Sequence, residues 1–286
     1  MKLVALEKVC LKEINKNINF NLCFYLILDL SFPYILKMYV KRHSLTNYGG
    51  NTWAYLTGFE QVVTDGTATY YAIDWGSSHI VKFNDYWEYQ NYQNLSFPQP
   101  FTTKFVNGYF YFSSNDYFYK TNSNFSLINS YEKKEAGYRQ FIFDSNSSKF
   151  YVAAYSLNRI DIFDASCSFL QSIQLGFGPF GLAYVNGLLY TGHEDSNKQI
   201  SVIKNGKIIR DFNVSQCNSS LISGITMDSF GYMAISCYDS KLITVYDLNG
   251  NYMNTQISTS STPIITSVDS KGRYVTITYK SLDIYY

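Results

Sequence analysis

The chain has 286 residues, of which 18% are aromatic and 16% are charged, and its formal net charge is +1 at pH 7. Because neither sign of charge is in excess, the chain has no general attraction for nucleic acid, and such binding would need a local patch. The five cysteines are too few for a disulfide scaffold of this length, and no two form the CxxC pair that is typical of zinc sites.

The N-terminal segment, residues 1 to 48, differs from the rest of the chain. Four lysines precede an apolar run from Leu22 to Leu28, which is the order found in a signal peptide or signal anchor. Against that reading, Glu7 and Glu13 lie in the basic region, the run is too short to cross a bilayer, and no A-x-A-like cleavage site follows. A secretory leader and a disordered leader both remain open.

From residue 49 a unit of about 42 residues repeats six times. The third unit is the clearest, with four short runs rich in β-branched and aromatic residues between Phe141 and Ile173, each bounded by turn formers. Asn-Gly and Asp-Gly turns, which tolerate positive φ, recur after the first strands. The first turns of the six units begin at Asp65, Asn107, Asp144, Asn186, Asp228 and Asp269.

Four strands per unit and six units predict an all-β, six-bladed β-propeller of four-stranded antiparallel blades, formed by residues 49–286. The sixth unit ends at Tyr286 without a fourth strand, whereas a spare apolar strand precedes the first unit. We therefore expect an N-terminal strand to close the last blade, through pairing of Trp53 to Phe59 with Leu282 to Tyr286. The alternative, an open stack of repeats, would leave an unpaired strand at each end.

The units resemble NHL repeats, in which an Asp-x-x-Gly turn precedes an apolar strand and then an Asn-Arg-Ile-type strand. The third unit matches best, with Asp144, Tyr151-Val152 and Asn158 to Phe163, although it lacks the Gly after its first turn. The resemblance implies a propeller that binds proteins, RNA or small ligands, or that acts as a lyase or hydrolase. It supports the fold more strongly than any activity.

Catalytic signals are weak. The chain has no G-x-S-x-G, and within the repeats only His79 and His193 are histidines, which cannot complete a metal site by themselves. We expect no catalytic residue, no metal and no cofactor, and we read His193 as part of a solvated loop. The first hypothesis is a monomeric, non-catalytic binding propeller with a protein, peptide or glycan partner.

Two other functions stay open. One is a channel-based enzyme of the lyase or lactonase kind. The other is an RNA-binding propeller that uses a small basic patch of Lys204, Lys207 and Arg210, which Asp211 and the low net charge dilute.

The innermost strands line the central channel of a propeller, and we expect a ligand, if the chain has one, at the rim where these strands begin. By the register of the repeat, the residues expected at this rim with side chains suited to binding are Phe101, Tyr138, Arg139 and Phe180.

The linker from Ser215 to Ser220 crosses from one blade toward the next, which predicts a disulfide between Cys217 and Cys237 and leaves Cys167 as a free thiol. Two unpaired thiols are the alternative. Together with the leader, five N-x-[ST] triplets predict a secreted glycoprotein. A chain this rich in Asn, Ser and Thr also produces such triplets by chance, so a cytoplasmic protein is the alternative. The triplets begin at Asn94, Asn124, Asn146, Asn213 and Asn218.

Overall fold

The computed structural model describes residues 6–11, 22–27, 41–45, 47–48, 51–52, 62–64, 69–74, 76–97, 99–193, 199–218, 221–228, 230–259, 261–268, 273–278 and 282–285. The chain divides into two compact units, Met1–Met38 and Tyr39–Tyr286. In the first unit, β1 (Leu6–Leu11) and β2 (Leu22–Ile27) pair in an antiparallel hairpin. No helix in the described part of the chain has the length and apolar character needed to cross a bilayer.

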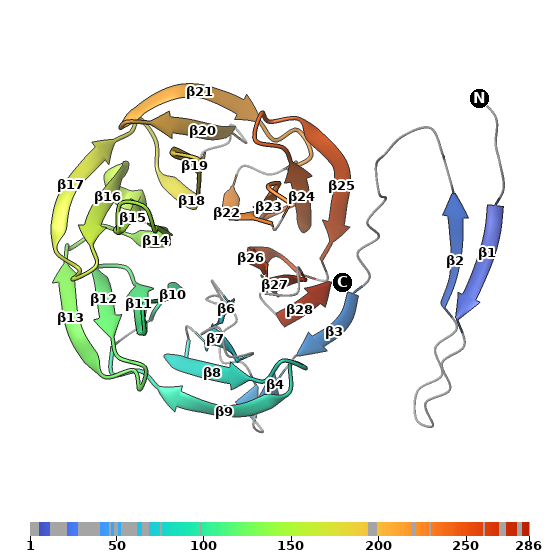
Figure 1. The fold of residues 1–286 in the computed structure, drawn as a ribbon, viewed down its shortest axis with the longest axis horizontal. Coiled ribbons are helices and arrows are strands. Elements are labelled where there is room, and N and C mark those ends of the chain that lie inside the picture. Colours follow the sequence, from blue (N-terminus) through green and yellow to red (C-terminus); the bar gives the residue numbers. More distant parts are fainter. Residues whose placement is uncertain are drawn as a thin grey trace. The chain divides into compact units, whose positions relative to one another are not determined.

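The second unit is a ring of six four-stranded antiparallel sheets around a central channel, which confirms the six-bladed propeller (Figure 1). From the channel outward, the first three blades are β6 (Val62–Thr64), β7 (Tyr70–Asp74), β8 (His79–Phe83) and β9 (Tyr89–Asn94); β10 (Thr102–Val106), β11 (Tyr109–Ser113), β12 (Tyr117–Thr121) and β13 (Leu127–Glu132); and β14 (Tyr138–Asp144), β15 (Lys149–Ala154), β16 (Arg159–Asp164) and β17 (Phe169–Gln174).

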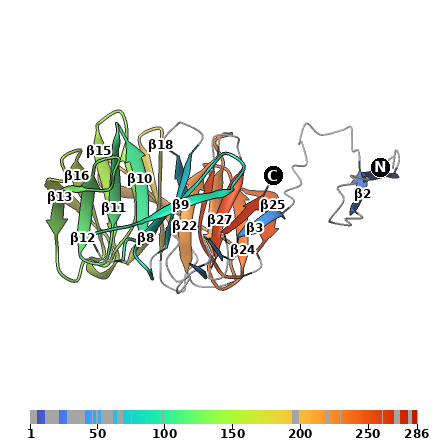
Figure 2. The same ribbon diagram turned by 90° about the horizontal axis from the view of Figure 1, so that it is seen from below.

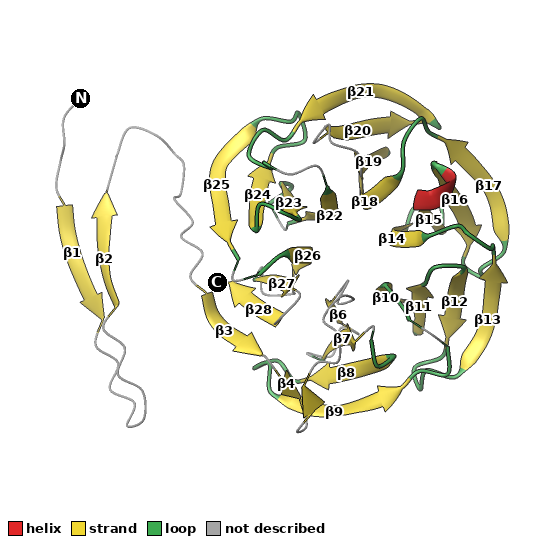
Figure 3. Cartoon of the chain, turned by 180° about the vertical axis from the view of Figure 1, so that it is seen from behind, coloured by secondary structure: helices red, strands yellow, loops and turns green. Residues whose placement is uncertain are grey.

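The other three blades are β18 (Pro179–Val185), β19 (Leu188–His193), β20 (Gln199–Lys204) and β21 (Lys207–Asn213); β22 (Ile222–Met227), β23 (Met233–Cys237), β24 (Leu242–Tyr246) and β25 (Tyr252–Ser258); and β26 (Pro263–Val268), β27 (Tyr274–Thr278), β28 (Leu282–Tyr285) and β3 (Lys41–Leu45). Outside the blades, β4 (Asn47–Tyr48) pairs with β5 (Asn51–Thr52), and a short 3-10 helix, η1 (Tyr155–Leu157), lies beside β14 and β15 (Figure 3).

The middle strands of each blade carry the apolar residues because neighbouring blades cover both of their faces. Every residue of β7 is buried, whereas β9, the outermost strand of the same blade, is exposed along most of its length. Aromatic rings fill the space between blades, as where Tyr111 of the second blade lies 4.2 Å, centre to centre, from Phe150 of the third. Figure 2, turned by 90° from Figure 1, shows the ring edge-on, with strands of neighbouring blades standing side by side.

The Asn-Gly turns have the backbone conformation that the sequence predicts. Asn107 and Gly108 have φ of 51° and 84°, and Asn186 and Gly187 have φ of 51° and 77°. Positive φ at both central residues gives a turn whose twist matches that of the flanking strands, so these pairs set the register of the first hairpins in the second and fourth blades.

An N-terminal strand closes the sixth blade, as expected, but the predicted strand was wrong. β28 pairs with β3, so that Leu282 faces Leu45 and Ile284 faces His43. The expected partner, Trp53 to Phe59, lies outside the described residues. The segment Lys41–Leu45 is basic and polar, which made it read as the end of the leader, but an outermost strand has one solvated face and does not need an apolar composition.

Candidate functional site

The innermost strands of the blades begin at one end of the channel, here called the upper rim, and end in hairpins at the other end. Phe101 directly precedes β10, Arg139 is the second residue of β14 and Phe180 is the second residue of β18. Antiparallel pairing brings the end of β15 back to the same rim, where Ala154 faces Tyr138. Tyr155, at the start of η1, therefore joins this group.

Four side chains meet here and are called the Arg139 cluster: Phe101, Arg139, Tyr155 and Phe180. The guanidinium carbon of Arg139 lies 4.3 Å from the ring centre of Phe101, 5.4 Å from that of Tyr155 and 5.5 Å from that of Phe180. Such distances allow cation–π attraction, which favours a guanidinium over an aromatic face. Phe101 is buried and the other three are partly exposed.

Hydrogen bonds hold Arg139 in this position. Its Nη1 donates to Oδ1 of Asn115 at 3.0 Å and to the carbonyl oxygen of Tyr138 at 3.2 Å. Its own carbonyl oxygen accepts bonds from the buried hydroxyls of Thr102, at 2.9 Å, and Ser113, at 2.7 Å. The second blade thus fixes the backbone from which Arg139 projects.

Two glycines make room for the ring of Tyr155. A Cβ atom on Gly178 would lie 2.7 Å from Cδ2 of Tyr155, and one on Gly137 would lie 3.2 Å from its Cδ1. Gly178 has no positive φ, so its lack of a side chain is a matter of space alone. Tyr155 was not among the residues predicted at the rim, although the alternating strand direction is a signal that places the segment after each second strand there.

Of the residues predicted at the rim, the structure brings Phe101, Arg139 and Phe180 together but not Tyr138. Tyr138 is fully buried, and its hydroxyl donates to Oδ2 of Asp161 at 2.8 Å. Burial and the carboxylate of Asp161 both raise the pKa of this phenol. Tyr138 therefore stabilises the third blade and does not face the channel opening.

The two histidines within the repeats, His79 and His193, pack against neighbouring side chains. His193 is buried at the end of β19, not in a solvated loop as predicted: its Nε2 lies 2.7 Å from the hydroxyl oxygen of Ser201, and Phe177 stacks on its ring. The ring of His79 stacks on Tyr92. Among the described residues, no three His, Cys, Asp or Glu side chains are grouped so that they could hold a metal ion.

The predicted basic patch is partly used for packing. Arg210 of β21 donates through Nη1 to the carbonyl oxygen of Asn249 at 2.8 Å and through Nη2 to that of Leu248, which ties the fourth blade to the fifth. Lys204 and Lys207 are exposed on either side of the β20–β21 turn.

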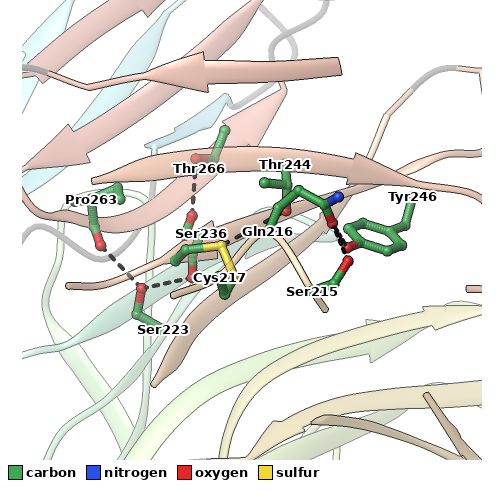
Figure 4. Close-up of a disulfide and its surroundings, with 10 residues drawn as sticks. Ser215, Gln216, Cys217, Ser223, Ser236, Thr244, Tyr246, Pro263 and Thr266 are labelled. Carbon is green, nitrogen blue, oxygen red and sulfur yellow. Dashed lines mark hydrogen bonds between the residues drawn. A yellow bond between two sulfur atoms is a disulfide. The ribbon is translucent and has the colours of Figure 1, made fainter. Parts of the chain in front are cut away.

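A disulfide joins Cys217 and Cys237, with their Cα atoms 5.2 Å apart (Figure 4). It links the segment that follows β21 to the end of β23, and both cysteines are buried. Nearby, the hydroxyl of Ser223 donates to the carbonyl oxygens of Ser236 and Pro263 (Figure 4), so the fifth and sixth blades are also joined by a hydrogen bond. Cys167 is a free, buried thiol.

The five asparagines of the N-x-[ST] triplets all lie at the surface. They occupy turns, ends of outer strands or, for Asn218, the loop after β21, and each is exposed: Asn94, Asn124, Asn146, Asn213 and Asn218. Exposure is required for glycosylation but is also usual for asparagine, so it leaves the modification as a prediction.

No family model matches the chain, and no curated protein matches it. The similarity to NHL repeats therefore remains a prediction, whereas the propeller fold does not depend on it.

Solved propeller structures match most of the chain at low sequence identity. A streptogramin B lyase is 11% identical with a TM-score of 0.62, and the match covers 82% of this chain and 94% of that one. A virginiamycin B lyase from Staphylococcus aureus is 13% identical with a TM-score of 0.62, covering 85% of this chain and 83% of that one. The WD40 propeller domain of Doa1 is 12% identical with a TM-score of 0.61, covering 79% and 77%. At these identities the similarity shows the β-propeller fold alone.

Proposed function

We propose that the chain is a monomeric, non-catalytic binding propeller whose upper rim receives an acidic side chain or carboxylate of a protein or peptide partner at the Arg139 cluster. The observation that supports this function is the contact of one guanidinium with three aromatic rings from three separate segments, Phe101, Tyr155 and Phe180. Arginine and aromatic residues dominate the binding energy of protein interfaces, and a guanidinium held in one plane suits the geometry of a carboxylate.

A photo-crosslinking experiment tests where the partner binds. A benzophenone amino acid replaces Phe180 at the upper rim, or Phe230, which is exposed in the β22–β23 hairpin at the opposite end of the channel. Extract of the source cells is then irradiated with each protein. We expect position 180 to crosslink one protein that position 230 does not. Equal labelling from both positions, or labelling from position 230 alone, would overturn the proposed binding face.

Arginine variants test the chemistry once that partner is in hand. Arg139→Gln removes the charge at the rim, and Arg210→Gln removes an arginine that also contacts an aromatic ring, that of Phe212, but lies on an outer strand. We expect Arg139→Gln to weaken binding about tenfold or more and Arg210→Gln to leave it within about twofold.

The alternative is a channel-based enzyme of the lyase or lactonase kind. It is favoured by the similarity in fold to the streptogramin B and virginiamycin B lyases. Incubation of the protein with virginiamycin B, followed by mass spectrometry of the antibiotic, separates the two functions, since turnover would replace the binding proposal by the enzymatic one. An RNA-binding propeller ranks third. In that case the protein would be retained on immobilised RNA and released as the salt concentration is raised.

We further propose that the protein is a secreted glycoprotein. The disulfide between Cys217 and Cys237 supports an oxidising compartment, and the exposed triplets support glycosylation. A mobility shift after glycosidase treatment of protein from a eukaryotic host is the expected result, and an unglycosylated protein recovered from the cytoplasm would refute it.

A further inference from the structure

The channel holds a second feature, separate from the Arg139 cluster: a cavity of about 310 Å³ nearer the lower hairpins. The innermost strands of five blades contribute described residues to its wall, from β10, β14, β18, β22 and β26. Apolar side chains such as Phe105, Ile142 and Leu182 form much of this wall. Its volume lies at the lower end of the range for small-molecule sites.

Gln140 closes the end of this cavity that lies nearest the upper rim. Its Oε1 accepts from the backbone N–H groups of Leu182, at 2.8 Å, and Ile225, at 3.2 Å, while its Nε2 donates to the carbonyl oxygen of Ile225 at 3.0 Å. The amide therefore ties β14 to β18 and β22. These bonds use two acceptor sites of Oε1 and one of the two N–H donors of Nε2, so Gln140 serves mainly as part of the wall.

Lys104 of β10 is the one charged residue among the described residues that line the cavity. In the part of the chain that the structure describes, no hydrogen bond or ion pair joins its ammonium to another residue. Burial lowers the pKa of Lys104 from 10.5 to about 8. A cation in these surroundings costs stability unless it is paired with an anion.

The fold itself does not require a lysine here. The four other inner strands whose described residues line this wall contribute neutral side chains, including Ile142, Ala183, Thr226 and Ser267. Because these four strands fill the wall with neutral side chains, packing alone does not explain a charged side chain on β10. Departures from the local pattern that lower stability are typical of functional positions.

We propose that this cavity binds a small organic monoanion, whose carboxylate pairs with Nζ of Lys104 and whose apolar body lies against Phe105, Ile142 and Leu182. One cation calls for one negative charge, and the apolar wall excludes polyanions such as nucleotides, which need several donors. The hydroxyl of Thr226, also in the wall, is suited to donate to the second carboxylate oxygen.

Binding of this kind depends on pH through Lys104. Among the described residues, the titratable groups that face it are the phenols of Tyr111, its cross-strand partner, and Tyr184 on β18. Burial is the main cause that raises the pKa of both phenols, so both stay neutral while Lys104 titrates. Affinity for a carboxylate is therefore expected to fall as the pH rises through about 8.

The test uses the full chain and two pairs of matched probes: benzoate with benzamide, and hexanoate with hexanamide. Binding is followed by calorimetry and by thermal shift at pH 7. We expect a carboxylate to bind and its amide not to bind, and we expect Lys104→Met to weaken binding about tenfold or more. Lys134→Met, at an exposed position, is the matched control and retains binding.

The wild-type protein supplies a measurement that does not depend on how the variant folds. Between pH 7 and pH 9.5, carboxylate affinity is expected to fall about tenfold or more. The proposal is overturned if neither carboxylate binds the wild-type chain, if the amides bind equally well, or if Lys104→Met retains full affinity. Binding that survives Lys104→Met but is lost in Arg139→Gln would assign the anion to the upper rim and also overturn it.

Discussion

At the scale of single residues, Tyr138 stabilises the third blade through a hydrogen bond that Tyr138→Phe would remove. The carboxylate of Asp161 would keep its bonds from Arg159 and Ser172, so it would not be left unpaired. We expect a loss of about 1–2 kcal/mol in the free energy of unfolding, measured by urea denaturation. Tyr109→Phe is the control, because Tyr109 is partly exposed, and a loss of equal size there would contradict the assignment.

Lys104 is expected to make the stability of the wild-type chain depend on pH, and Lys104→Met removes this dependence. The pKa of Lys104 is lower in the folded chain, about 8, than its ordinary value of 10.5. Below pH 8 both states are protonated, and the folded state carries the full cost of removing this half-buried charge from water. Between pH 8 and 10.5 the folded state loses its proton first, so the wild-type chain gains stability as pH rises.

The methionine variant lacks this cost and is expected to be more stable than the wild-type chain at pH 7, by roughly 3 kcal/mol as an upper estimate. The difference should disappear near pH 10.5. Urea denaturation of both chains at pH 7, 9 and 10.5 measures it, and a difference independent of pH would show that packing, not charge, separates the two proteins.

The sequence predicted part of the upper rim because register alone locates strand starts. Phe101, Arg139 and Phe180 are equivalent positions in three successive blades, and the structure brings the other two rings to the guanidinium of Arg139. Tyr155 and Lys104 were missed for different reasons. Tyr155 depends on the room left by Gly178, and the importance of Lys104 appears only once the cavity around it is known.

At the scale of elements, Gly178→Ala tests how the segment before β18 supports the Arg139 cluster. The added methyl group would lie 2.7 Å from the ring of Tyr155, so the ring must move. We expect partner binding to weaken about as much as in Arg139→Gln, with little change in stability, because the site is at the surface. Gly176→Ala is the control, since a Cβ atom there meets nothing within 4 Å. Unchanged binding in Gly178→Ala would remove Tyr155 from the site.

The disulfide stabilises the connection between the fourth and fifth blades. Cys217 and Cys237 are 20 residues apart, and loss of a bridge of this length costs roughly 3 kcal/mol in the chain-entropy account. The double variant Cys217→Ala, Cys237→Ala is expected to lose stability of this order in urea denaturation. Dithiothreitol should destabilise the wild-type chain and leave the double variant unchanged, and an equal effect on both would mean that the bridge is absent in solution.

The middle strands were predicted from sequence in all six blades, whereas the closing strand was not. Middle strands are covered on both faces and need apolar and aromatic residues, so their composition is distinctive. Outermost strands are not: β9 reads Tyr-Gln-Asn-Tyr-Gln-Asn, and five of its six residues are exposed. A basic segment such as Lys41–Leu45 satisfies the same requirement, so composition could not separate it from the leader.

At the scale of the whole molecule, the ring depends on a strand from the far end of the chain. β3 pairs with β28 through four residue pairs, between Lys41–Leu45 and Leu282–Tyr285. This contact joins the first and last parts of the propeller and covers the edge of the sixth blade, which would otherwise offer unpaired N–H and C=O groups to another chain. Two truncations separate the role of β3 from that of the residues before it.

Removal of residues 1–38 leaves β3 in place and should preserve both the cooperativity of urea unfolding and the free energy of unfolding. Removal of residues 1–45 deletes β3, and we expect a loss on the order of 3 kcal/mol or more, since at about 1 kcal/mol per backbone hydrogen bond the lost ladder alone is of this size. Size-exclusion chromatography should show association of the shorter chain through the exposed edge of β28. Equal stability of the two truncations, both monomeric, would mean that another segment closes the ring and would return that role to the region of Trp53 to Phe59.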